Sequence, residues 1–158
     1  MNIKTSKGFT IVEVLVAMII LAIGVLGLGV MQLSSLQNTR GGQMRSQATV
    51  LAYDIIDSMR ANIPAVTAGH YNSADNILDS GATQCYGAGA NCTDQEMANA
   101  DLDRWNTALR LNLPPTGWGT VTTTDNGNTS VVTVTVNWTD SYTPDGFEQL
   151  TLTSELMK

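Results

Sequence analysis

The sequence has little of what metal sites, nucleic-acid interfaces and most enzymes require. It contains one histidine and two cysteines in 158 residues, which excludes a zinc finger or an iron–sulfur cluster built from this chain alone. Basic residues are scarce, with 8 Lys and Arg against 14 Asp and Glu, so the chain lacks the basic face of a nucleic-acid binder. The acids at Asp140 and Asp145 lack the regular spacing of an EF-hand. We therefore predict no metal, no cofactor and no direct nucleic-acid partner.

Catalytic motifs are equally sparse. The single histidine, His70, lies in a glycine-rich stretch beside Tyr71, and a Ser–His–Asp or Cys–His site would have to be built on it. Gly87 and Gly89 precede no helix that carries a lysine, so no phosphate-binding loop is indicated. The sequence therefore predicts a protein that is not an enzyme.

What the sequence does contain is one long hydrophobic run near its start. Eighteen of the 23 positions in residues 9–31 are A, V, I, L, M or F, and the only ionisable residue among them is Glu13. As a helix, this run would span roughly 35 Å, enough to cross a bilayer core. Lys4 and Lys7 precede the run, so the positive-inside tendency keeps that end cytoplasmic and exports the rest. We predict a transmembrane helix over residues 9–31.

The residues around this run differ from those of an ordinary secretory signal peptide. Such a peptide carries an A-x-A-like cleavage site after the apolar run, and LAIGVLGLGVMQLSSLQ contains no clear site of that kind. A small residue lies instead before the apolar run, at Gly8 directly ahead of Phe9. Cleavage there would keep the hydrophobic segment as the new N-terminus.

The segment KGFTIVEVLVAMIILAIG resembles the class III signal and N-terminal helix of type IV pilins and of the related type II secretion pseudopilins. The residues that stand at the family's positions are Lys7, Gly8, Phe9, Thr10 and Glu13. The resemblance implies a leader peptide over residues 1–8, cleavage after Gly8 by prepilin peptidase and N-methylation of Phe9. It also implies that Glu13 acts in assembly by pairing with the Phe9 amine of a neighbouring subunit. The alternatives are a carboxylate that is harmless near the membrane interface, and a single-pass anchor with an incidental glutamate.

Beyond the apolar run, the helix is expected to continue as an amphipathic segment over residues 32–63. Its apolar residues form one helical stripe: Met44, Ala48, Leu51, Ala52, Ile55 and Met59. Pro64 is expected to end the helix. Two groups of glycines lie along it. The first, Gly24–Gly29, fits either close helix packing or a stretch that unwinds, and the second, Gly41-Gly42, predicts a bend or break.

Residues 64–158 are expected to form the globular head of the protein. Residues 65–92 are rich in Gly, Ala, Asn and Ser and are predicted to be a loop. Cys85 and Cys92 lie within it, and in an exported domain they are expected to form a disulfide.

A helix and a sheet are predicted after this loop. Thr93-Asp94-Gln95-Glu96 is a capping box, and it opens a helix over residues 94–112 in which Trp105 is expected to lie in the core. Alternating residues and short turns then predict an antiparallel sheet over residues 120–156. Its strands are expected at 120–124, 132–139 and 147–156.

The predicted fold class is therefore α+β, a pilin fold. Its long N-terminal helix, with a hydrophobic first half, packs on a C-terminal antiparallel sheet that one additional short helix accompanies. Within the family, the chain resembles minor pilins of the PilV type. The residues that carry this resemblance are LAYDIIDSMRANIPAV, GHYN, the cysteine pair, and the helix from Asp101 to Trp105 that ends in LNLPPTGWGTV.

This resemblance implies a structural subunit of a type IV pilus that helps to initiate or prime assembly, in a tip complex, and supports adhesion, twitching motility or DNA uptake. It implies other minor and major pilins, prepilin peptidase and the inner-membrane assembly platform as partners. The subunit would lie in the bacterial inner membrane with a periplasmic head, and in the extracellular pilus after assembly. The alternatives are a minor pseudopilin of a type II secretion system, and a membrane-anchored adhesin that uses residues 65–92 as its ligand surface.

Overall fold

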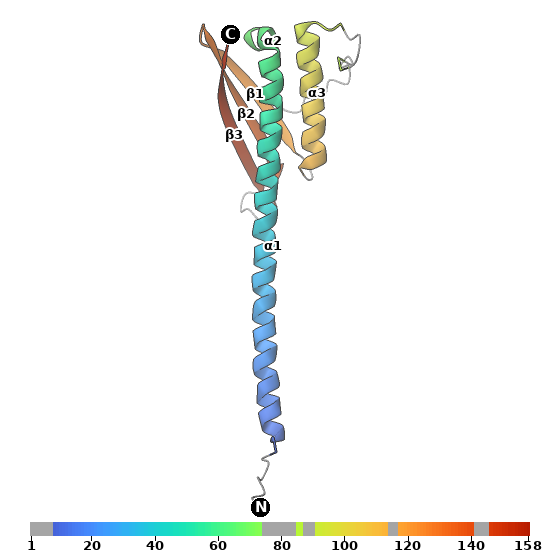
Figure 1. The fold of residues 1–158 in the computed structure, drawn as a ribbon, viewed down its shortest axis with the longest axis vertical. Coiled ribbons are helices and arrows are strands. Elements are labelled where there is room, and N and C mark those ends of the chain that lie inside the picture. Colours follow the sequence, from blue (N-terminus) through green and yellow to red (C-terminus); the bar gives the residue numbers. More distant parts are fainter. Residues whose placement is uncertain (1–7, 74–84, 87–90, 114–116, 141–145) are drawn as a thin grey trace, which may run out of the picture. The chain divides into compact units, whose positions relative to one another are not determined.

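The computed structural model describes residues 8–73, 85–86, 91–113, 117–140 and 146–158 (Figure 1). Their elements, in chain order, are α1 (Ile11–Ala61), α2 (Ile63–Thr67), α3 (Asp94–Asn112), β1 (Trp118–Asp125), β2 (Thr129–Thr139) and β3 (Phe147–Met157). A long N-terminal helix, an antiparallel three-stranded sheet and shorter helices form a pilin-like α+β arrangement, which confirms the predicted class. The chain divides into two compact units, Met1–Arg40 and Gly41–Lys158.

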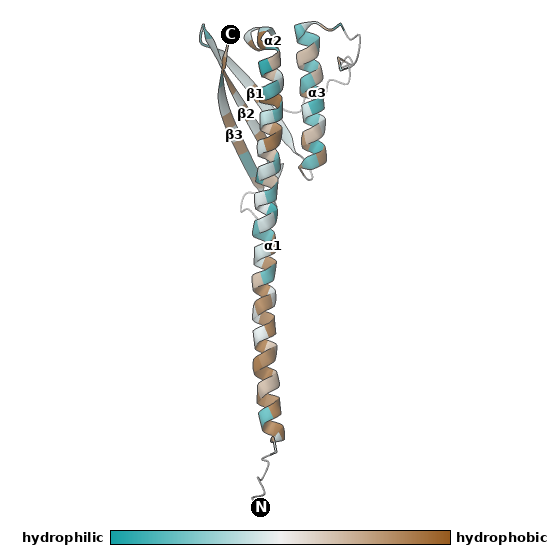
Figure 2. Ribbon diagram, in the orientation of Figure 1, coloured by the Kyte–Doolittle hydropathy of each residue, from teal (hydrophilic) through white to brown (hydrophobic). Residues whose placement is uncertain are grey.

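In the first unit, α1 is apolar and exposed. An 18-residue window of the helix has a mean hydropathy of 2.9, and none of that window is buried. Figure 2 shows that hydrophobic residues predominate along the first half of α1. By length and composition, α1 is the one helix among the described residues that could cross a membrane.

The helix is continuous where a bend or break was predicted. Residues Ile11–Ala61 form one α-helix that includes both groups of glycines, so the prediction at Gly41-Gly42 is wrong for the secondary structure. Each glycine costs a helix only about 0.5–1 kcal/mol relative to alanine, which the turns on either side outweigh. The boundary between the two units nevertheless falls at Gly41.

In the second unit, the C-terminal part of α1 buries most of the predicted stripe, and Met44 and Leu51 are partly buried against the same core. Its fully buried residues are Ala48, Ala52, Ile55, Ile56 and Met59. The helix ends at Ala61, close to the predicted stop, but Pro64 then lies in the first turn of α2 rather than in a loop. A proline fits there because the first N–H groups of a helix have no intrahelical partner to lose. Residues 65–92 are therefore not all loop, because α2 extends to Thr67.

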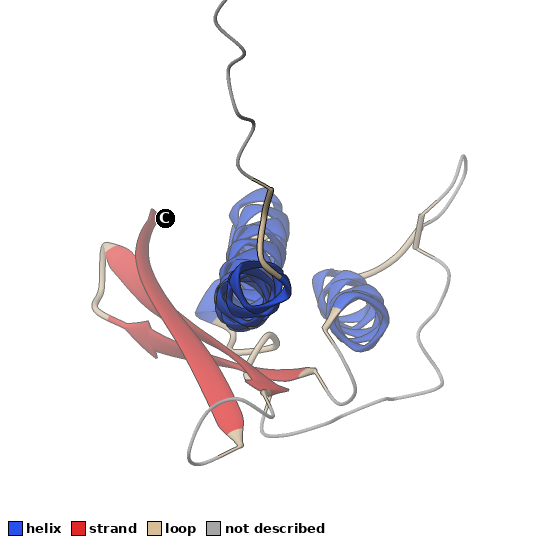
Figure 3. Cartoon of the chain, turned by 90° about the horizontal axis from the view of Figure 1, so that it is seen from below, coloured by secondary structure: helices blue, strands red, loops and turns tan. Residues whose placement is uncertain are grey.

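The sheet has the order β1-β2-β3 with antiparallel neighbours, and Val134 on β2 pairs with Val121 on β1 and Leu152 on β3. One face of the sheet is buried in the core with α1 and α3. Figure 3 shows the sheet along one side of α1 and α3 along another. Strands β1 and β2 begin earlier than predicted, at Trp118 and Thr129, because Trp118 pairs with Asn137 at the end of β1 away from the hairpin turn and Thr129 pairs with Met157 on β3.

Helix α3 begins with the predicted capping box. The Thr93 hydroxyl accepts from the backbone N–H of Glu96, and the Glu96 carboxylate accepts from the backbone N–H of Thr93. Trp105 is fully buried as predicted, and its Nε1 donates to the backbone oxygen of Leu51 at 2.8 Å. Gly119 lies against the same ring, where a Cβ atom would come within 2.3 Å of Trp105 Cη2. Only glycine therefore lets β1 approach the indole this closely.

Candidate assembly site and the polar network of the head

The predicted assembly residues lie together at the start of α1. Thr10 is the residue before the helix, and its side-chain oxygen accepts from the backbone N–H of Glu13 at 3.3 Å. The Thr10 backbone oxygen accepts from the same N–H at 3.1 Å. Thr10 thus acts as an N-cap, the position at which a threonine hydroxyl satisfies a free helical N–H. The spacing of Thr10 and Glu13 places the carboxylate in the first turn of the helix, where the macrodipole favours negative charge.

Gly8 and Phe9 lie beside this turn and are accessible. Phe9 is 82% exposed, and among the described residues, chain neighbours apart, no atom lies within 4 Å of the position that a Cβ on Gly8 would take. Glu13 is also exposed, and none of the described residues forms an ion pair with its carboxylate. Residues 1–7 of the predicted leader, which include Lys7, lie outside the described residues. The geometry is that of an accessible peptide bond, Gly8–Phe9, one helical turn from an exposed acid.

An apolar surface runs along α1 before and after this acid. Its exposed large side chains include Ile11, Val12, Val14, Leu15, Val16, Met18, Ile19, Ile20, Leu21, Ile23, Val25, Leu26, Leu28, Val30, Met31, Leu33 and Leu36. A contiguous apolar surface of this extent marks contact with a membrane or with other proteins.

In the head, the structure confirms the predicted disulfide between Cys85 and Cys92, whose Cα atoms are 5.9 Å apart. Cys92 directly precedes Thr93, the N-cap of α3. The bond therefore attaches residue 85 to the start of that helix.

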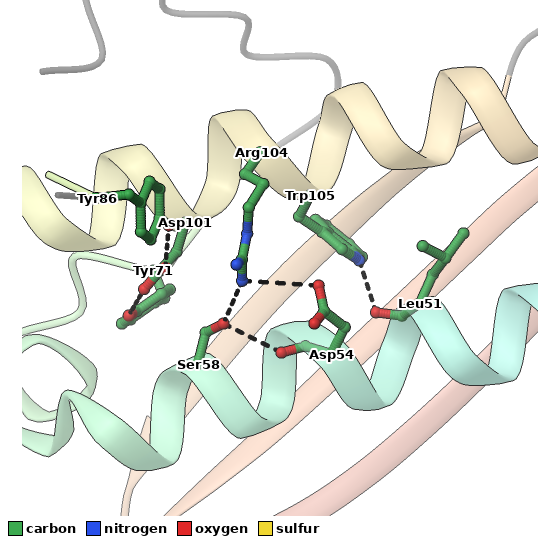
Figure 4. A network of polar contacts seen from close by, with 8 residues as sticks. All are labelled: Leu51, Asp54, Ser58, Tyr71, Tyr86, Asp101, Arg104 and Trp105. Atoms are coloured by element: carbon green, nitrogen blue, oxygen red, sulfur yellow. Dashed lines mark hydrogen bonds and ion pairs between the residues drawn. The ribbon is translucent and has the colours of Figure 1, made fainter. Parts of the chain in front are cut away.

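A buried polar network next to this disulfide was not predicted (Figure 4). Asp101 on α3 is only 5% exposed, and its two oxygens accept hydrogen bonds from the hydroxyls of Tyr71 and Tyr86. The distance from Tyr71 is 2.5 Å. Burial raises the pKa of both tyrosines above the usual value, and the hydrogen bond to the Asp101 carboxylate is the second largest cause of the rise. The sequence contains one signal for this site: Asp101 lies on the same helical face as Ala98 and Trp105, where a carboxylate needs hydrogen-bond donors.

Arg104 connects the network to α1. Its guanidinium carbon lies 5.0 Å from the centroid of the Tyr86 ring, a cation–π contact. One of its nitrogens donates to the Ser58 hydroxyl at 3.0 Å and lies 3.7 Å from a carboxylate oxygen of Asp54. Tyr86 is thus contacted by two side chains of α3, one of which also binds α1.

The structure places His70, the single histidine, and shows no metal-binding cluster among the described residues. His70 lies just after α2, where its backbone N–H donates to Ala65 at 2.9 Å. No cluster of three or more His, Cys, Asp or Glu side chains that could hold a metal ion occurs among the described residues. Asp145, weighed above as a calcium ligand, lies outside them.

The fold and the N-terminal site together define a class of protein: a pilin-like subunit with an exposed, membrane-length N-terminal helix and a disulfide-bonded head. Residues 3–29 match the prokaryotic N-terminal methylation motif, and residues 30–103 match the family described as type IV pilin Tt1218. These two adjoining matches support the type IV pilin superfamily for this chain, and with it a pilus subunit. No curated protein and no solved structure gives a match.

Proposed function

We propose that this chain is a minor pilin of the PilV type, which helps to initiate or prime a type IV pilus as part of a tip complex. The observation that carries the proposal is the arrangement at the start of α1. There an accessible Gly8–Phe9 bond and an exposed Glu13 lie directly before a helix surface that is apolar and exposed. The match to the methylation motif over residues 3–29 supports the same reading. The match to the type IV pilin family over residues 30–103 supports a structural subunit rather than an enzyme.

The proposed mechanism begins with processing. Prepilin peptidase cleaves the Gly8–Phe9 bond, which removes residues 1–8 and creates a new amine on Phe9. N-methylation leaves that amine cationic. The exposed Phe9 side chain and the open space around Gly8 leave room for the enzyme and for a neighbouring subunit.

Assembly then uses the charge and the apolar surface together. The carboxylate of Glu13 pairs with the Phe9 amine of a neighbouring subunit, because an acid in an apolar environment is costly unless it is paired. The apolar residues after Glu13 exchange lipid contacts for contacts with neighbouring helices. Thr10 contributes by capping the helix and thereby fixing the position of Glu13.

The proposal also includes the protein's cellular location and its partners. Before assembly the chain spans the inner membrane once, with its N-terminus in the cytoplasm and its head in the periplasm. It contacts other minor and major pilins and the assembly platform. After assembly it lies in the extracellular pilus. There it supports adhesion, twitching motility or DNA uptake through the fibre rather than through direct nucleic-acid binding.

Glu13→Gln tests the assembly role, because glutamine keeps the size and polarity of the side chain and removes its charge. We expect normal cleavage and methylation by mass spectrometry of the N-terminus, and at least a tenfold loss of the protein from sheared pili. Glu155→Gln is the matched control, because Glu155 is an exposed acid of the head, on β3, and its loss should leave incorporation unchanged. Wild-type incorporation of Glu13→Gln would refute the pairing.

The same experiments separate the alternatives. A mature N-terminus that still begins with Met1 would exclude processing as a pilin. Co-purification with a secretion pseudopilus in place of a pilus would favour the pseudopilin reading. Adhesion that survives Glu13→Gln, with no pilus defect, would favour an anchored adhesin.

A further inference from the structure

Tyr86 is held in the head by its neighbour in the sequence and by the residues that its ring and hydroxyl contact. Cys85 precedes it, is 5% exposed, and is bonded to Cys92 directly before the N-cap of α3. The Tyr86 hydroxyl donates to Asp101, and its ring contacts Arg104. The disulfide and Asp101 therefore fasten residues 85 and 86 to two points on the same helix.

The two tyrosines of the network differ in what else holds them. Tyr71 is fully buried in the hydrophobic core cluster, and it lies between two backbone contacts: His70 bonds to Ala65, and Ser73 pairs with Val121 on β1. Neither Cys85 nor Tyr86 belongs to that cluster. Tyr71 is thus fixed by packing, whereas Tyr86 is fixed by the disulfide and by its polar contacts.

We propose that the Cys85–Cys92 disulfide is a redox-sensitive latch, which holds Tyr86 on the buried carboxylate of Asp101 while it is closed and releases Tyr86 when it opens. The opening reaction is a two-electron reduction by a dithiol. The S–S bond of the protein breaks to give two cysteine thiols, and the dithiol supplies both hydrogens and becomes a disulfide itself. The core cluster of α1, α3 and the sheet stays folded.

Chain entropy is the reason for this behaviour. Ordering residues of a long connection costs backbone freedom, and a cross-link removes much of that cost in advance by restricting the open chain. Without the cross-link, the Asp101 and Arg104 contacts must order residues 85 and 86 unaided. Tyr71 has no such dependence, because α2 and the bridge to β1 place it.

Tyrosine ionisation reports the latch directly. Burial and the Asp101 carboxylate raise the pKa of Tyr86, and the other charged groups of the described residues that act on it are Arg104 on α3 and Asp54 on α1. A released tyrosine ionises near pH 10. The full chain in detergent is titrated by absorbance at 295 nm, first oxidised, then after treatment with dithiothreitol, alkylation with iodoacetamide and removal of the reagents. We expect reduction to add one tyrosinate near pH 10.

Tyr86→Phe is the control, and in this variant reduction should add none. Far-UV circular dichroism at neutral pH should be the same for the oxidised and the alkylated wild-type chain. An unchanged titration of the wild-type chain would show that Tyr86 stays bound without the disulfide, and would overturn the proposal. Two added tyrosinates in the wild-type chain, or one in Tyr86→Phe, would show that Tyr71 is released as well, and would also overturn it.

Discussion

At the scale of single residues, the buried acid of α3 depends on its two hydroxyl donors. Both oxygens of Asp101 are occupied by tyrosine hydroxyls, so Asp101→Asn would place an amide group that donates opposite a hydroxyl that also donates. We expect a loss of about 1–3 kcal/mol in the free energy of unfolding, the cost of a buried polar group left without its partner. Urea unfolding of the full chain in detergent, followed by tryptophan fluorescence, measures it.

Asp103→Asn is the matched control for this variant. It removes the same charge from the same helix at a residue that is not buried, so its effect should stay within about 0.5 kcal/mol. Equal effects of the two substitutions would show that net charge, and not the tyrosine network, is responsible.

Gly119 gives a second prediction at this scale, because the indole of Trp105 fills the space that a side chain would need. Gly119→Ala would place Cβ 2.3 Å from Trp105 Cη2, so the ring or the strand must move. Overpacking of this kind costs about 1–3 kcal/mol, which thermal unfolding would register as a lower Tm. Gly42→Ala should instead raise stability by about 0.5–1 kcal/mol, because no described residue outside its own helical turn lies within 4 Å of its Cβ position and alanine favours a helix. A neutral Gly119→Ala would contradict the close packing of β1 on Trp105.

At the scale of elements, the capping box of α3 makes stability depend on pH. Hydrogen bonds from the Thr93 backbone and side chain hold the pKa of Glu96 below its usual value. A carboxyl group with a lowered folded-state pKa stabilises the fold above its unfolded pKa, about 4.3, and loses that contribution as the pH falls through the lower folded value. We therefore expect the stability of the wild-type chain to fall more steeply between pH 6 and pH 3 than that of Glu96→Gln, in urea titrations at each pH.

Glutamine at position 96 can still accept from the Thr93 N–H but does not titrate, which isolates the charge. Thr93→Ala removes the hydroxyl that caps the Glu96 N–H, and should cost about 1 kcal/mol at pH 7. Parallel pH profiles for the wild-type chain and Glu96→Gln would show that other acids produce the dependence.

Elements with a local signal could be predicted from the sequence, and those that depend on distant residues could not. The capping box needs only residues 93–96, and the valines of β2 alternate with polar residues along a single strand. Helix α2 has five residues and no periodicity to read. The hydrogen bonds from Tyr71 and Tyr86 to Asp101 join residues that are 30 and 15 positions apart. No local sequence pattern therefore predicts which residues bind Asp101. At the N-terminus the motif predicts the processing and assembly residues, whereas the N-cap contact of Thr10 is visible only in the structure.

At the scale of the whole molecule, the two units differ in how far their apolar side chains are exposed to solvent. The large apolar side chains of the first unit are exposed, whereas the second unit has a buried hydrophobic cluster. The first unit therefore requires a lipid or protein environment, and this requirement leads to the last prediction.

Leu21 lies within the apolar run and is 69% exposed, so an arginine there would lie in the hydrocarbon region if the helix spans a membrane. Insertion of an arginine near the middle of such a helix costs about 2.5–3.5 kcal/mol. We expect Leu21→Arg to lower the fraction of the protein that remains in the membrane pellet after alkaline carbonate extraction. Ser35→Arg adds the same charge beyond residue 31 and should stay in the pellet like the wild-type chain. Equal retention of Leu21→Arg and Ser35→Arg would place the membrane contact somewhere other than residues 9–31.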